Sequence, residues 1–469
     1  MAKNSQFRTE KDSLGDVKVP VDRYWGAQTQ RSVENFPIGE DRFQPVFIRA
    51  YAQVKKAAAK SNHAFGLLTD NEVRTMCQVC DEIIAGKLDD HFPLVVWQTG
   101  SGTHTNMNLN EVIANRSAEI LGLPMGLKTP IHPNDHANKS QSSNDTFPTA
   151  MHVAAATAVT GSLLPALGKL KVSLDKKAKD FAAFMKTGRT HLMDAAPLTL
   201  GQEFSAFAAQ VAFAEKAVEQ ALPGLFQIAA GATAVGTGLN SPHGFAAEIA
   251  QQLAKATGLP IVSADNSFAA IAAHDAVVQA SGSLKLAATV LMKIANDIRF
   301  LASGPRCGLG EIMLPANEPG SSIMPGKVNP SQCEALTMVA VRVIGNDVTI
   351  SMAGAGGQFQ LNTYKPVMIF TLLESIELIA DACNSFRERC LDGIEAVAEK
   401  LDQNFNRSLM LATALVPAVG YDQAAKIVRL AAKEDISLKE ASVKLNILSD
   451  AEFDRIVKPE KMVRPYSMS

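Results

Sequence analysis

No proline interrupts the 44 residues between Pro260 and Pro305. Within this stretch, Val277, Leu284 and Leu291 recur at seven-residue steps, which places them on one face of an α-helix. Proline ends or kinks helices, so its absence permits one helix much longer than the usual three turns or so. A long helix with an apolar stripe must bury that stripe against other helices, so the stretch predicts a helical bundle.

Four further stretches have a similar pattern and are expected to be long helices. Several such helices bury their stripes against one another, which predicts a mainly α fold with a central bundle. Aromatic residues make up only 6% of the chain and alanine is abundant, which favours closely packed helices. The four stretches are residues 148–178, 201–222, 330–350 and 366–390.

The two ends of the chain differ from this middle part. The N-terminal part mixes Gly- and Pro-bearing segments with shorter helical patterns. Near the C-terminus, Ser437 with Glu440 and Ser449 with Glu452 each fit a capping box, which marks the start of a helix. The expected domains are a mixed, partly helical N-terminal domain (1–140), a central long-helix bundle (141–393) and a small helical C-terminal domain (394–469).

Composition and charge narrow the class of protein. With 469 residues, 47% of them apolar, the chain can bury a large core. We find no run of ~18 apolar residues and therefore expect no membrane span. The net charge of −2 argues against a nucleic-acid partner. A small anionic substrate held by local cations remains compatible with this charge.

Six cysteines are too few for a disulfide scaffold in a chain of this size, and they predict a reduced, cytoplasmic setting. Cys77 and Cys80 have the spacing of a redox or zinc pair, but no second pair completes a site, so no metal is expected. Residues 1–5 lack the apolar core of a signal peptide, which agrees with a cytoplasmic location.

The stretch from Gly320 to Pro330 concentrates groups that bind oxyanions. Its glycines and prolines interrupt regular structure, so it is expected to be a loop. Two serine hydroxyls, the ammonium of Lys327 and the amide of Asn329 lie within it. From composition alone, an ordinary surface turn and a functional loop are equally good interpretations.

Three more polar clusters lie far apart in the sequence, and each has an ordinary explanation. Residues 100–108 combine glycines, hydroxyls and amides, which suits a carboxylate-binding loop or a helix cap. Residues 141–145 precede a helical pattern and are better explained, alone, as a cap. His191 is a candidate acid or base in a polar stretch, although most single histidines are structural. Glu334 suits either an imidazole partner or a helix N-terminus.

Taken together and in this order, the four clusters resemble the signature motifs of the fumarase/aspartase superfamily. Residues 24–31 and 234–240 also match superfamily motifs, and the loop variant with Gly326 and Lys327 resembles the class II fumarases in particular. The resemblance extends from about Lys11 to Met462, nearly the whole chain. It implies a three-domain subunit with five long helices, a homotetramer with a twenty-helix core, and composite active sites built by three subunits.

The resemblance implies reversible hydration of fumarate to L-malate in the citric acid cycle, without a metal or organic cofactor. Ser321 would remove the C3 proton of malate, and His191, paired with Glu334, would handle water at C2. Donors around the substrate would stabilise an aci-carboxylate intermediate. The implied substrate-binding residues are Ser101, Gly102, Thr103, Ser142, Ser143, Asn144, Thr190, Ser322, Lys327, Val328 and Asn329.

A second dicarboxylate site, outside the catalytic pocket, is also implied by the resemblance. The family often carries an arginine three residues before the histidine of this site, where this chain has Thr129. Whether Lys128 takes the place of that arginine is left open. The implied second site comprises His132, Pro133, Asn134 and Asp135.

Two other functions are weighed against fumarate hydration. An aspartate ammonia-lyase would share the serine-containing loop. In that branch of the superfamily, however, the position of His191 resembles a glutamine position. An ammonium leaving group is already protonated and needs less help from an acid than hydroxide does, so His191 favours water. A non-catalytic relative would have lost part of the acid–base set, whereas Ser321, Lys327 and Glu334 are all present.

Overall fold

The computed structural model describes residues 7–465, and most of them are helical, which confirms the predicted mainly α class. Residues 1–5, the subject of the signal-peptide prediction, lie outside the described part. The chain divides into two compact units, each built from three separate segments, and the domain boundaries at 140 and 393 stay a prediction. Unit 1 comprises Met1–Pro165, Ala214–Thr289 and Val339–Ala380, and unit 2 comprises Ala166–Phe213, Val290–Met338 and Asp381–Ser469.

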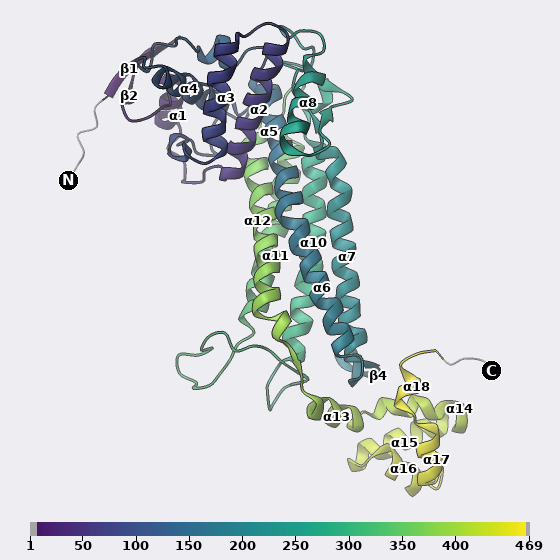
Figure 1. Ribbon diagram of the computed structural model, residues 1–469. Helices are drawn as coiled ribbons and strands as arrows, with labels where there is room; N and C mark the ends of the chain where they lie inside the picture. The colour runs from purple at the N-terminus through teal and green to yellow at the C-terminus, as the bar shows by residue number, and fades with distance from the viewer. Residues whose placement is uncertain (1–6, 466–469) are drawn as a thin grey trace. The chain divides into compact units, whose positions relative to one another are not determined.

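Five long helical segments, marked in Figure 1, supply residues to the units. The first is continuous through a π-helical turn at Val159–Leu163, which joins α5 to α6. The helix predicted between Pro260 and Pro305 begins later than expected. Asn266 caps a separate short helix there, so the apolar pattern alone overstated its length. The long helices are α5 (Ser143–Ala158), α6 (Leu164–Asp180), α7 (Leu200–Leu225), α10 (Asp275–Leu301), α11 (Ser331–Gly354) and α12 (Lys365–Arg389).

Within unit 1, parts of these helices pack through buried aliphatic side chains such as Leu222, Leu284 and Ile376. Polar contacts fix neighbouring helices as well, since the Asn346 amide on α11 donates to the hydroxyl of Ser375 on α12 at 3.0 Å. The other elements of unit 1 are β1 (Phe7–Asp12), β2 (Gly15–Pro20), α1 (Ala27–Asn35), α2 (Pro45–Ala64), α3 (Asp70–Ile84), a 3-10 turn (Asp89–His91), α4 (Thr103–Ile120), a π-helical turn (Pro133–Ala137), β5 (Gln227–Ile228), α8 (Phe245–Thr257), β6 (Val262–Ser263) and α9 (Ser267–Ala272).

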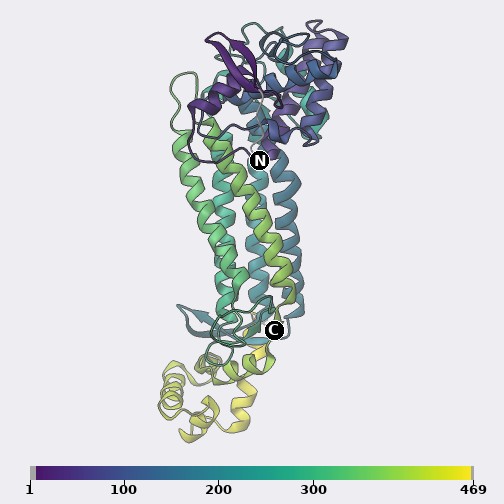
Figure 2. The same cartoon turned by 90° about the vertical axis from the view of Figure 1, so that its left-hand side faces the viewer.

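Within unit 2, the ring of Phe204 packs edge-on against Phe181 with ring centroids 5.2 Å apart. The short C-terminal helices, coloured yellow in Figure 2, enclose a separate apolar cluster around Leu415 and Ile427. Both predicted capping boxes in this region are confirmed. The remaining elements of unit 2 are β3 (Met185–Thr190), β4 (Met193–Thr199), β7 (Ile312–Met313), a 3-10 turn (Leu391–Gly393), β8 (Glu395–Ala396), α13 (Ala398–Arg407), a 3-10 helix (Leu409–Leu415), α14 (Val416–Val419), α15 (Tyr421–Glu434), α16 (Leu438–Lys444), α17 (Asp450–Ile456) and α18 (Pro459–Met462).

Three of the long helical segments are long and apolar enough, by length and composition alone, to cross a membrane. Isolated polar residues interrupt the apolar runs in these segments. The segments are therefore apolar on average, although none contains an unbroken run of ~18 apolar residues. The expected absence of a membrane span therefore stays a prediction. The three segments are Ser143–Asp180, Asp275–Leu301 and Ser331–Gly354.

Candidate active site

The loop before α4 and the start of α5 meet through a chain of hydroxyls in unit 1. The hydroxyl oxygens of Ser101 and Thr103 lie 2.8 Å apart, and those of Thr103 and Ser143 lie 2.6 Å apart. Gly102 precedes α4 with a φ of +77°, and a Cβ atom there would lie 2.0 Å from the ring of Phe147. The structure therefore brings two clusters, 40 residues apart in sequence, into direct contact.

The start of α5 is a capping box. Ser142 accepts a hydrogen bond from the backbone N–H of Asn144, and Asp145 accepts one from the backbone N–H of Ser142 at 2.9 Å. Ser142 thus holds the N-cap position, within the segment 141–145 that the sequence indicated as a cap. The side chain of Asn144 is thereby free to donate to the carbonyl of Ala234 at 2.9 Å.

Two helix N-termini thus lie side by side beneath this group of hydroxyls. The first N–H groups of a helix lack intrahelical partners, and the helix dipole is positive at that end. Small carboxylates are bound well by this combination of N–H groups, hydroxyls and an amide. This part of unit 1 therefore has the chemistry of a carboxylate-binding surface.

In unit 2, His191 lies at the tip of a two-residue hairpin between β3 and β4. His191 and Leu192 have φ angles of 58° and 61°, and Thr190 pairs with Met193. Two consecutive positive φ angles are typical of a type I′ turn, whose twist matches that of the flanking strands. Both Thr190 and His191 are exposed, so the hairpin presents them to the outside of this chain.

A buried ionic network supports this hairpin. Glu311 is fully buried, and its carboxylate lies 2.6 Å from Arg189 and 3.3 Å from Lys186, both on β3. Burial alone would raise the pKa of Glu311, but Arg189 and then Lys186 hold this pKa below its ordinary value. The side-chain amide of Asn404 also donates to the carboxylate at 3.2 Å. These contacts anchor β3, the strand that leads to His191, to the buried carboxylate of Glu311.

We expect Glu311→Gln to lower the free energy of unfolding by ~3–5 kcal/mol, because it removes the buried carboxylate that Arg189 and Lys186 share and leaves Lys186 with Glu203 alone, at 3.0 Å. Since the folded-state pKa of Glu311 is lowered, its stabilising effect is present above the ordinary glutamate pKa and is lost as the pH falls through the lowered value. Urea unfolding at several pH values measures both effects. Exposed Glu395→Gln is the matched control, and an equal loss in both variants would refute a specific role for Glu311.

The loop from Gly320 to Pro330 is closed by its own hydrogen bonds. The backbone N–H of Gly320 donates to the carbonyl of Lys327 at 2.8 Å, and the Asn329 amide donates to the carbonyl of Gly320 at 2.6 Å. Gly326 has a φ of +78°, a conformation that other residues resist. The two ends of the loop are therefore tied together by hydrogen bonds within the loop itself.

Inside this loop, the hydroxyl oxygen of Ser321 accepts hydrogen bonds from two backbone N–H groups, those of Ile323 at 3.3 Å and Met324 at 3.0 Å. Such donors stabilise negative charge on the oxygen. Ser322, Lys327 and Val328 are exposed around it, whereas Asn329 is half-buried. The backbone thus supplies the kind of stabilisation that a serine needs to act as a base.

Glu334 lies in the first turn of α11 and is exposed. Within residues 7–465 of a single chain, the structure shows no hydrogen bond or ion pair between Glu334 and His191. Their predicted pairing is therefore not made inside one chain. It stays a prediction that needs a second copy of the chain.

At the proposed second site, the ring of His132 accepts hydrogen bonds from the backbone N–H groups of Asn134 at 3.1 Å and Asp135 at 3.2 Å. Pro133 begins the π-helical turn beside it. The ammonium of Lys128 donates to the carbonyl of Lys11 at 2.7 Å. The adjoining cavity has a volume of about 20 Å³, which suits a single water molecule. Dicarboxylate binding here stays a prediction, and it requires these groups to rearrange.

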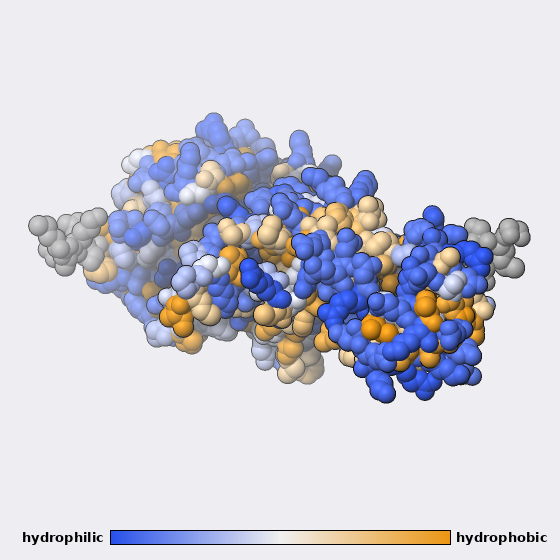
Figure 3. Space-filling view, turned by 90° about the horizontal axis from the view of Figure 1, so that it is seen from below, coloured by the Kyte–Doolittle hydropathy of each residue, from blue (hydrophilic) through white to orange (hydrophobic). Residues whose placement is uncertain are grey.

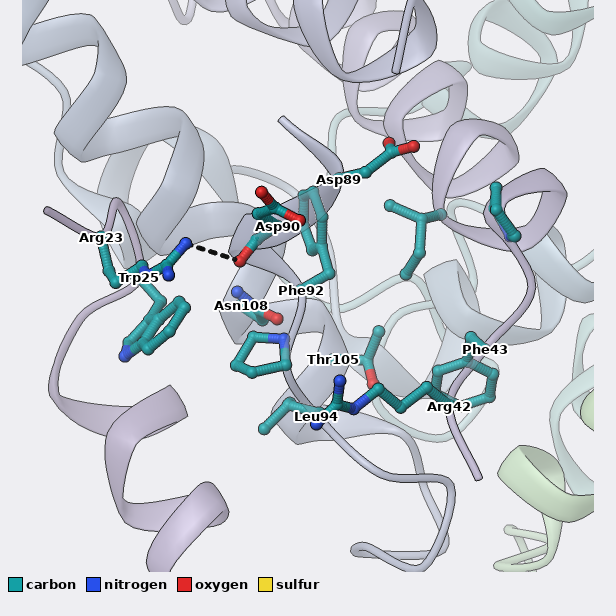
Figure 4. A pocket seen from close by; sticks show the side chains of 13 residues that line it. Arg23, Trp25, Arg42, Phe43, Asp89, Asp90, Phe92, Leu94, Thr105 and Asn108 are labelled. Carbon is teal, nitrogen blue, oxygen red and sulfur yellow. Dashed lines mark hydrogen bonds between the residues drawn. The ribbon is translucent and has the colours of Figure 1, made fainter. Parts of the chain in front are cut away.

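A larger cavity of about 470 Å³ lies in unit 1, apart from the predicted catalytic residues (Figure 4). The guanidinium of Arg23 donates to the carbonyl of Asp90 at 3.4 Å across its edge. Positive and negative side chains both border the cavity, so it selects no single ligand charge. Its lining residues include Arg23, Trp25, Arg42, Phe43, Asp89, Asp90, Phe92, Thr105 and Asn108.

Comparison with known proteins identifies the class. Residues 15–345 match the family described as Lyase, and residues 411–464 match the family described as Fumarase C C-terminus. The chain is thus a lyase by family and by fold. Among solved structures, class II fumarase from Schistosoma mansoni superposes with a TM-score of 0.96 at 42% identity, covering 98% of this chain and 100% of that one.

Relatives with similar sequences identify a narrower family within the lyases. Fumarate hydratase class II 1 of Pseudomonas aeruginosa is 56% identical over 456 residues, which is 97% of this chain and 98% of that protein. The mitochondrial fumarate hydratase of Homo sapiens is 55% identical over 468 residues, 99% of this chain and 91% of that protein. The chain belongs to the class II fumarate hydratase family.

Proposed function

We propose that the chain catalyses the reversible hydration of fumarate to L-malate, as a step of the citric acid cycle. The observation that carries this proposal is the Ser321 loop, where two backbone N–H groups point at one serine oxygen. The sequence relatives at 55–58% identity, all named fumarate hydratases, support the same reaction.

In this proposal, Ser321 removes the proton from C3 of malate. A proton beside a carboxylate is weakly acidic, and its removal places a second negative charge on that carboxylate. The resulting aci-carboxylate is stabilised by Lys327, by Asn329 and by loop N–H groups. The hydrogen bonds that Ile323 and Met324 donate lower the free energy of the serine alkoxide, which is otherwise a poor base near neutral pH.

His191 completes the reaction at C2 by delivering a proton to the departing hydroxyl, or by activating water in the other direction. Glu334 orients the imidazole and raises its basicity. The hydroxyls of unit 1, with the N-termini of α4 and α5, hold the substrate carboxylates. No metal or organic cofactor takes part in the proposed chemistry, and the substrates are the dicarboxylates fumarate and L-malate.

We propose a homotetramer with composite sites, in which a second copy brings the partner of His191. The lack of a His191–Glu334 contact among residues 7–465 of one chain supports this proposal. One face of α11 supports this assembly. Met338, Val341, Val348 and Met352 recur along it with exposed fractions of 67%, 59%, 61% and 73%. Figure 3 shows further apolar patches among hydrophilic side chains. An exposed apolar stripe of this length is typical of a helix that packs against another subunit.

We propose a cytoplasmic location, without membrane or nucleic-acid partners.

The deciding assay follows the absorbance of conjugated fumarate with L-malate and, in a parallel reaction, with L-aspartate. We expect turnover of malate only, with a rate that EDTA leaves unchanged. Turnover of aspartate but not malate would replace the proposal with an aspartate ammonia-lyase. Loss of the rate with EDTA would instead point to a metal-dependent mechanism.

A further inference from the structure

Lys365, the first residue of α12, is buried without a partner. Its exposed fraction is 0%, and its ammonium has no hydrogen-bond acceptor among the described residues. Burying an unpaired charge is costly, and such groups seldom persist without a function. The mechanism proposed above does not use this side chain.

The backbone around Lys365 supports the first carboxylate-binding loop. The N–H of Lys365 donates to the carbonyl of Gly100 at 3.2 Å. A Cβ atom on Gly100 would lie only 1.5 Å from the carbonyl oxygen of Thr363, so the two backbone segments are in close contact. Any shift of the start of α12 would therefore displace the loop that carries Ser101 and Thr103.

Asp145 connects the same region to two further segments. Its carboxylate accepts hydrogen bonds from the backbone N–H groups of Ser142, Gly231 and Thr233, at 2.9, 3.0 and 2.9 Å. Asp145 is fully buried, and its negative charge raises the pKa of Lys365 against the lowering effect of burial. The Lys365 backbone thus contacts the Gly100 loop, and the Asp145 carboxylate binds the Ser142 turn and the 231–233 segment.

We propose that Lys365 is a positioning residue: its backbone N–H holds the Gly100 loop, and its buried ammonium acts through its charge on Asp145, the carboxylate that fixes the Ser142 turn. The inference rests on the proposed function, because it assigns Lys365 to the same substrate site. A bound dicarboxylate adds negative charge above Lys365 and so favours the protonated ammonium. Binding and protonation of Lys365 are therefore linked.

The linkage falls in an accessible pH range. Burial lowers the pKa of Lys365 to about 7, and Asp145 opposes this decrease. Burial also raises the pKa of Asp145 to about 6 and lowers that of Lys55, which hydrogen-bonds Asn138 and Gln141, to about 7. His274 and His152 face the same interior, and burial lowers the pKa of His274 well below its ordinary range and that of His152 to about 4. Dicarboxylate binding slightly above neutral pH is thus expected to draw in a proton at Lys365.

Isothermal titration of the whole protein with succinate, a C4 dicarboxylate that cannot undergo the reaction, tests this inference. Comparing buffers of different ionisation enthalpy between about pH 7.5 and 8 counts the protons taken up. We expect proton uptake by the wild type and a clear reduction in Lys365→Met, with kcat/KM for malate about 10- to 100-fold lower. Lys365→Arg keeps its charge throughout this range, so it should restore binding without proton uptake. Exposed Lys87→Met is the matched control.

Thermal unfolding separates positioning from a structural role. Because the pKa of Lys365 is lowered, its stabilising contribution is present above the ordinary lysine pKa and is lost as the pH falls through about 7. Lys365→Met should therefore unfold at no lower temperature than the wild type at pH 7, and Lys365→Gln provides a second variant of this kind. Unchanged proton uptake and kcat/KM in folded Lys365→Met would overturn the inference. A wild type that does not convert malate would instead refute the proposed function.

Discussion

Replacing Ser321 with alanine is expected to lower kcat for malate by about 10²- to 10⁴-fold, the usual contribution of a positioned base. The N–H groups of Ile323 and Met324 would then point at a methyl group, and the site would lack an acceptor for the C3 proton. KM should change much less, because Ser321 acts mainly in the transition state. Steady-state kinetics with L-malate measure both quantities.

The matched control is Ser13→Ala, in the exposed turn between β1 and β2. This variant should keep the wild-type rate, because the change lies on the surface and touches none of the proposed site. Near-normal turnover by Ser321→Ala would remove it as the base, and the loop would then serve only to bind carboxylate.

His191→Asn is expected to have the second largest effect. Asparagine keeps a polar side chain at the tip of the hairpin but cannot exchange a proton near neutral pH, so departure of hydroxide from C2 loses its acid. We expect kcat to fall by about 10²-fold or more in both directions of the reaction. Rates are measured from fumarate and from L-malate, with exposed His243→Asn as control. An unchanged rate in either direction would exclude His191 from the mechanism.

Much of the fold could be predicted from the sequence, because apolar spacing and capping residues act locally. The helices expected at 201–222 and 366–390 are found at Leu200–Leu225 and Lys365–Arg389. The stretch after Pro260 was predicted less well. There the Asn266 side chain accepts hydrogen bonds from the backbone N–H groups of two following residues and starts a separate helix. The absence of proline does not reveal this helix start.

The candidate site was predictable only where its residues share a short motif. The Ser321 loop makes hydrogen bonds within itself, so its eleven neighbouring residues were enough to suggest it. Lys365 was missed because a lysine at the start of a helix normally lies in solvent, whereas tertiary packing leaves this one 0% exposed. The predicted His191–Glu334 pairing is not made within the described residues of one chain, and local sequence patterns do not encode contacts between copies.

The composite site is the central claim, and mixing Ser321→Ala with His191→Asn tests it most directly. The two inactive variants are unfolded together in equal amounts, refolded, and assayed with L-malate beside each variant refolded alone. If Ser321 and His191 in one site come from different subunits, random assembly leaves about a quarter of the sites with both residues intact, and activity should return to about that share of wild type. If both residues came from the same subunit, every site would carry one lesion, and a mixture as inactive as its components would contradict the account.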